Sequence, residues 1–221
     1  MGLRRIAGVF GTGLIVAGCA ISDVTLMPTL PASVATGSRR GEGREILVFR
    51  PFVNQRPQAR CGMKKNGYNT ESASILCGRD PAFTLADLLV GELAAAGFKV
   101  IQDPRSASPS TLVLTGALEQ AFLEPKANFS YVTFETDIAL HLTVQNAAGL
   151  VAQRRFYVKG EEATYFASED DMQRSFDSAA RQLVTNVVGA VANLADRFPP
   201  GIAPPAPKDA PLQAAPPEGT P

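Results

Sequence analysis

Histidine is almost absent from this 221-residue sequence, which contains only His141. A nucleophile–histidine–carboxylate triad needs a carboxylate in contact with the imidazole. Asp137 is on the same face of the same expected strand, but four residues of strand put it about 13 Å away. A metal site needs three or four ligands, and Cys61, Cys77 and His141 would supply three only if a long loop folded onto the sheet. The sequence therefore predicts no catalytic residue and no metal site.

Phosphate-binding glycine motifs and an excess of one charge are missing too. Neither G-x-x-x-x-G-K-[ST] nor a strand-to-helix G-x-G-x-x-G sequence occurs. The chain has 21 basic and 21 acidic residues; without Arg4 and Arg5, which lie in the expected signal peptide, 19 basic residues face 21 acidic ones, a net charge of −2. Nucleic-acid binders show a strongly basic face. We expect no nucleic-acid partner, no cofactor and no enzymatic activity.

Apolar runs long enough to cross a bilayer are also lacking at the start of the chain. Ile6–Val16 is an apolar run of about eleven residues, against the roughly 20 that a spanning helix needs. With Arg4 and Arg5 before it, the run has the layout of a secretory signal peptide. Val16-Ala17-Gly18-Cys19 resembles a bacterial lipobox, which predicts cleavage before Cys19 and acylation of that cysteine. The alternative is an ordinary signal peptide with an incidental cysteine.

The residue after Cys19 indicates the membrane to which a lipoprotein is sorted. Ala20, rather than Asp, resembles the outer-membrane sorting pattern of lipoproteins. We therefore expect acyl chains on Cys19 to attach the protein to the outer membrane at its periplasmic face.

Composition divides the chain into four parts. Residues 1–18 are the signal peptide, and residues 19–43, which lack sustained periodicity, are expected to form a lipid-anchored flexible tether. Residues 44–198 are long enough for a single domain. Residues 199–221 are rich in Pro and Ala, and we expect this tail to be disordered.

The pattern within 44–198 predicts an α+β fold. Alternating or apolar stretches indicate strands at 45–52, 98–102, 111–123, 129–145 and 150–159. Asp80-Pro81 begins a helix that should end at Gly97, and Ser168 begins a second, long amphipathic helix. We expect a mostly antiparallel sheet of about five strands with two helices packed on one face.

Two cysteines remain after acylation of Cys19, and they lie in the stretch 54–80, which reads as a long irregular loop. An exported protein folds in an oxidising compartment, so we expect Cys61 and Cys77 to form a disulfide.

The same loop carries more basic than acidic residues, and we expect Arg60, Lys64, Lys65 and Tyr68 to contact an anionic partner. Such a partner would be a lipid headgroup or an acidic patch on an envelope protein. The alternative is a disulfide-bonded surface loop whose charged side chains contact water and no partner.

Several segments together resemble the YajG-like lipoproteins. They are a strand ending near Arg50-Pro51, the sequence Lys64-Lys65-Asn66-Gly67-Tyr68, and a helix with Leu88-Leu89, Glu92-Leu93 and Gly97-Phe98. The resemblance implies an outer-membrane lipoprotein of largely unknown role. Related lipoproteins of this plan serve as auxiliary parts of ABC-type lipid or solvent transport systems or act in envelope assembly.

These features predict a non-enzymatic, lipid-anchored cell-envelope lipoprotein that binds a protein partner or an amphiphilic ligand in the periplasm. One alternative is an auxiliary lipoprotein of an ABC-type transport system. The other is a periplasmic enzyme, which would need a cluster of polar side chains in a pocket.

Overall fold

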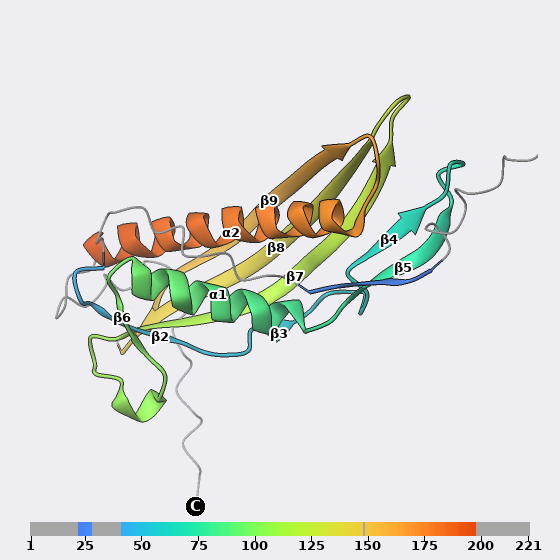
Figure 1. The fold of residues 1–221 in the computed structure, drawn as a ribbon. Helices are drawn as coiled ribbons and strands as arrows, with labels where there is room; N and C mark the ends of the chain where they lie inside the picture. Colours follow the sequence, from blue (N-terminus) through green and yellow to red (C-terminus); the bar gives the residue numbers. More distant parts are fainter. Residues whose placement is uncertain (1–21, 28–40, 148, 198–221) are drawn as a thin grey trace, which may run out of the picture.

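The computed structural model describes residues 22–27, 41–147 and 149–197 (Figure 1). The sheet is built around a long strand, β7 (Leu112–Ala127). One edge of β7 pairs with β8 (Val132–Asn146), which pairs in turn with β9 (Gly149–Thr164), both antiparallel. The signal peptide, Cys19 and the tail 199–221 lie outside the described residues.

Three short strands follow one another along the other edge of β7, all parallel to it. They are β2 (Glu45–Val48), β3 (Val53–Asn54) and β4 (Gly62–Lys65). Outside β2 lies β6 (Lys99–Ile101), parallel to it, and outside β4 lies β5 (Glu71–Cys77), antiparallel to it. A short 3-10 helix, Pro104–Ser106, follows β6.

A further strand, β1 (Val24–Leu26), pairs with β5 in parallel. It lies inside the stretch 19–43 that the sequence analysis assigns to a flexible tether. Val24 and Leu26 are buried and belong to the hydrophobic core. The folded part therefore begins well before residue 44.

The α+β class is confirmed, but the prediction of about five mostly antiparallel strands is wrong, because the described residues form nine strands in a mixed sheet. The expected strand 45–52 ends at Val48, before Pro51, which has no N–H to donate to a ladder, and β3 begins only beyond it at Val53. Most of the stretch 54–80 is a β-hairpin rather than an irregular loop. Strand β4 is too short for a period to show, whereas β5 alternates, with Ala73 and Ile75 buried, and this signal was missed in the sequence prediction.

Two helices lie on the same side of the sheet (Figure 1). Helix α1 (Pro81–Ala95) begins at Asp80, whose side chain accepts from the backbone N–H of Ala82, and Gly97 follows it at φ 90°. Helix α2 (Glu169–Arg197) runs antiparallel to β9. Within the described residues, no helix is both long and apolar enough to cross a membrane.

Buried contacts join α2 to the sheet. The Ser175 hydroxyl lies 2.8 Å from the Thr136 hydroxyl and donates to the carbonyl oxygen of Phe134, 3.0 Å away. Gly160 of β9 lies directly under the helix, where a Cβ atom would collide with the carbonyl oxygen of Ser175. Glycine at 160 lets the helix backbone approach the strand this closely.

Candidate functional site

A disulfide closes the base of the β4–β5 hairpin. Cys61, just before β4, is bonded to Cys77, the last residue of β5, with Cα atoms 5.5 Å apart. This is the pairing expected from the sequence. The bridge joins the two ends of the hairpin next to β7, whose Leu123 donates to the carbonyl oxygen of Cys61.

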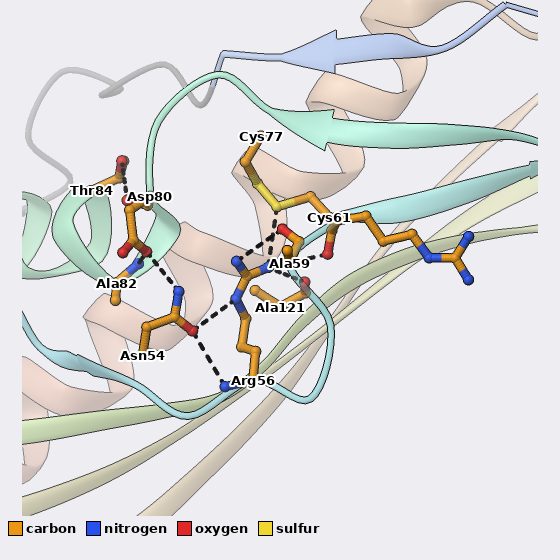
Figure 2. Close-up of a disulfide and its surroundings, with 10 residues drawn as sticks. Asn54, Arg56, Ala59, Cys61, Cys77, Asp80, Ala82, Thr84 and Ala121 are labelled. Carbon is orange, nitrogen blue, oxygen red and sulfur yellow. Dashed lines mark hydrogen bonds between the residues drawn. A yellow bond between two sulfur atoms is a disulfide. The ribbon is translucent and has the colours of Figure 1, made fainter.

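Arg56 holds the loop before the hairpin in place by hydrogen bonds (Figure 2). Its guanidinium donates hydrogen bonds to several acceptors around the disulfide: the carbonyl oxygens of Ala59, Arg60 and Ala121 and the sulfur of Cys61. Burial lowers the pKa of Arg56, and the negative charge of Asp80 opposes that shift. Sequence reasoning gave Arg56 no role, because a loop arginine carries no pattern of its own.

The residues predicted to contact a partner are mostly engaged within the domain. Arg60 forms a two-pronged ion pair with Glu71, and Lys65 pairs with Glu124. Lys64 is buried and donates to the carbonyl oxygen of Ser22 at 3.1 Å. Tyr68, at the hairpin turn, is 93% exposed. Of the four, Tyr68 alone presents its whole side chain to solvent, while the three cations have partners within the domain.

On the sheet face opposite α2, charged side chains are paired across strands. Glu135 accepts from Lys126 and Lys159, both at 2.7 Å, and these bonds lower its pKa. Asp137 accepts from the Tyr157 hydroxyl, which raises the pKa of that phenol. The hydrogen-bond partner of Asp137 is therefore Tyr157 and not His141.

Searching residues 22–27, 41–147 and 149–197 finds no group of three or more His, Cys, Asp or Glu side chains arranged to hold a metal ion.

A cavity of about 180 Å³ lies between strands β8 and β9 and the C-terminal half of α2. Its walls are mainly apolar, with two arginines among the lining residues. The lining includes Leu142, Phe156, Ala190, Leu194, Arg154 and Arg197. The guanidinium of Arg154 lies over the Phe156 ring, 5.3 Å from its centroid.

Neither arginine of this cavity forms an ion pair with another of the described residues. The sequence carries one signal of this cavity. On β9 the residues facing α2 are Ala152, Arg154, Phe156 and Val158, and a cation interrupts this otherwise apolar series.

Comparison with known proteins places the chain in a family. The family described as "uncharacterized lipoprotein" matches residues 53–189, more than half of the chain. A search of the curated proteins finds no match. Three solved structures illustrate the likeness to known folds.

The crystal structure of protein XCC0632 from Xanthomonas campestris has a TM-score of 0.58 at 15% identity, over 78% of this chain and 97% of that one. Lipoprotein GNA1162 from Neisseria meningitidis has a TM-score of 0.35 at 13% identity, covering 68% and 99%. Protein CT253 from Chlamydia trachomatis has a TM-score of 0.42 at 10% identity, covering 71% and 100%. The first of these supports the fold alone. By the family match over residues 53–189, this chain belongs to the family of uncharacterized lipoproteins.

Proposed function

We propose that the chain is a non-enzymatic, lipid-anchored lipoprotein of the cell envelope that binds an anionic amphiphile in the cavity between β8, β9 and α2. The observation that carries the proposal is the pairing of an apolar cavity with two arginines, Arg154 and Arg197, that have no anionic partner among the described residues. The family supports a lipid anchor, which acyl chains on Cys19 would provide. The outer-membrane location at the periplasmic face rests on Ala20, which resembles the sorting pattern.

The ligand chemistry follows from the two kinds of lining group. Leu142, Phe156 and Leu194 offer apolar surface, and each methylene group buried there contributes about 0.8 kcal/mol. A guanidinium binds a phosphate or carboxylate through charge-assisted hydrogen bonds. The cavity volume of about 180 Å³ is below the roughly 300–1,000 Å³ of drug-sized ligand sites. It therefore suits part of one acyl chain with an anionic head at its mouth, rather than a whole phospholipid.

Dodecyl phosphate is the probe that tests this proposal, with dodecanol as the uncharged comparison. Isothermal titration below the micelle concentration should give saturable binding of dodecyl phosphate and weaker binding of dodecanol. Replacing both Arg154 and Arg197 with Gln should weaken binding of the phosphate at least about tenfold, because a hydrogen bond to a charged group contributes about 1.5–3 kcal/mol.

Arg155→Gln is the matched control. Arg155 neighbours Arg154 but points to the opposite face of the sheet, where it pairs with Glu119. Its removal should leave the affinity unchanged. Ala190→Leu, which fills the cavity without touching a charge, should weaken both probes equally. Absence of saturable binding, or equal losses from Arg155→Gln and the double variant, would refute the proposed ligand site.

A further inference from the structure

Three connections between secondary-structure elements lie at one end of the sheet. Strands β4 and β7 run parallel, with Gly62 opposite Leu123. Tyr68 follows Gly62 by six residues, and Phe129 follows Leu123 by six. Thr164, the last residue of β9, pairs with Val132 at the start of β8. The β4–β5 turn, the β7–β8 turn and the β9–α2 connection therefore lie at the same end, as Figure 1 shows for the two turns.

Exposed aromatic side chains concentrate at this end. Four aromatic residues are more than three-quarters exposed within the described ranges, and all four lie here: Tyr68 93%, Phe129 108%, Tyr165 76% and Phe166 88%. The segments that carry them contain no charged residue. These segments are 66–70, 127–134 and 163–168. We call these three segments the aromatic end.

The N-terminal strand enters from the same direction. β1 is parallel to β5, which itself starts at the β4–β5 turn, so the chain before Val24 leads towards the aromatic end. Two hydrogen bonds hold the start of β1 in position. Lys64 donates to the carbonyl oxygen of Ser22, and the Asp23 carboxylate accepts from the Ser74 N–H at 2.7 Å. Cys19 precedes Ser22 by three residues, which span at most about 11 Å. An anchor on Cys19 would therefore attach the molecule within about 11 Å of Ser22.

We propose that the aromatic end lies on the bilayer that holds the anchor, with the rings of Tyr68, Phe129, Tyr165 and Phe166 in the headgroup region. Tyrosine rings are favoured at membrane–water interfaces, and exposed phenylalanine rings gain by leaving water for the headgroup–acyl boundary. Segments without charged side chains also avoid the cost of desolvating a charge there. Because no lysine or arginine lies in these segments, the contact does not require anionic lipid. The inference rests on the lipid anchor of the proposed function, but not on the ligand of the cavity.

The sequence offers a clean probe, because the chain contains no tryptophan. Phe129→Trp puts a single fluorophore at the aromatic end. Leu150→Trp puts one at the β8–β9 turn, at the other end of the same strands, and Leu150 is itself 54% exposed. Both substitutions replace an exposed apolar side chain.

The lipid is coupled chemically to the purified protein, so that membrane attachment does not depend on signal-peptide cleavage and acylation in the cell. In the chain from Cys19 to Pro221 with Cys61 and Cys77 bridged, Cys19 is the single free thiol. A maleimide lipid coupled to it places every molecule on zwitterionic phosphatidylcholine vesicles. A Trp ring at headgroup level should be measurably quenched by lipids brominated near the top of the acyl chains. Leu150→Trp should lose almost none of its emission.

Equal quenching of the two tryptophans, or none at Phe129→Trp, would overturn the proposal. A blue-shifted emission of Phe129→Trp without bromine quenching would also overturn it, because the ring would then be buried against protein. Quenching that appears only when the vesicles contain phosphatidylglycerol would contradict the uncharged contact. Failure of dodecyl phosphate to bind in the cavity would leave this result unaffected, so the two proposals fail separately.

Discussion

The Nζ atom of Lys64 donates a hydrogen bond to the carbonyl oxygen of Ser22, 3.1 Å away. This contact fixes the start of the folded chain against the disulfide hairpin. Only two residues, Ala20 and Ile21, separate Cys19 from Ser22, so a lipid on Cys19 would hold the domain close to the membrane. The contact of Lys64 with Ser22 therefore joins β4 to the start of β1.

Lys64→Met should loosen β1 while leaving the rest of the sheet in place. Methionine keeps the apolar length of the side chain but cannot donate to Ser22. We expect faster amide exchange at Val24–Leu26, measured by hydrogen–deuterium exchange. Lys65→Met is the control, since Lys65 pairs with Glu124 on β7 instead. Unchanged exchange in β1 with Lys64→Met would show that apolar burial alone holds this strand.

The Cys61→Ser/Cys77→Ser variant should be less stable. The bridge joins residues 16 positions apart, and closing a loop of this length contributes about 3 kcal/mol in the chain-entropy account. Urea unfolding should show a loss of about that size, and reduction of the native protein should reproduce it. Mass spectrometry without reductant should show the two residues linked. A loss below about 1 kcal/mol would mean that the unfolded state gains little freedom when the bridge is removed.

The elements that the sequence predicts well have strong local signals. Asp80-Pro81 and Gly97 mark the ends of α1 through capping chemistry, and Ser168 with Asp171 forms the reciprocal cap of α2. The apolar series on β8 from Phe134 to Val144 is buried as its period requires.

What the sequence does not predict depends on contacts between distant segments. Strands β3 and β4 are only two and four residues long and gain their order from pairing with β7. A strand of this length has too few positions for a period to show. The cavity is missed for a similar reason, because Arg154 and Arg197 meet only when α2 packs on β9.

Glu45 gives the fold a predictable dependence on pH. Its carboxylate accepts from Lys99 at 2.8 Å, from Ser108 at 2.8 Å and from Thr111 at 3.0 Å. These bonds, with that of Lys99 the largest, lower the pKa of Glu45 to about 2. A carboxyl whose pKa is lower in the folded state stabilises the protein above its unfolded pKa, and this contribution is lost as the pH falls through the folded value.

Glu45→Gln should therefore lower the urea midpoint at pH 7. The difference from the native protein should shrink between about pH 4.5 and pH 2, as the native carboxyl becomes protonated. Glu42→Gln, at an exposed position in the turn before β2, should leave the midpoint at pH 7 unchanged. A Glu45→Gln effect of constant size down to pH 2 would indicate that packing, not ionisation, is responsible.

Gly160→Ala should separate α2 from the sheet. The added Cβ would collide with the carbonyl oxygen of Ser175 and the backbone nitrogen of Ala179, both on α2. Overpacking of this kind costs about 1–3 kcal/mol, which urea unfolding would measure. Gly189→Ala is the matched control within α2, where a Cβ meets no atom within 4 Å. It should raise stability by about 1 kcal/mol, since Gly is the poorer helix former. Opposite signs for the two substitutions would establish close helix–strand contact at Gly160. A Gly160→Ala protein as stable as the native one would mean that α2 can shift along β9 without loss.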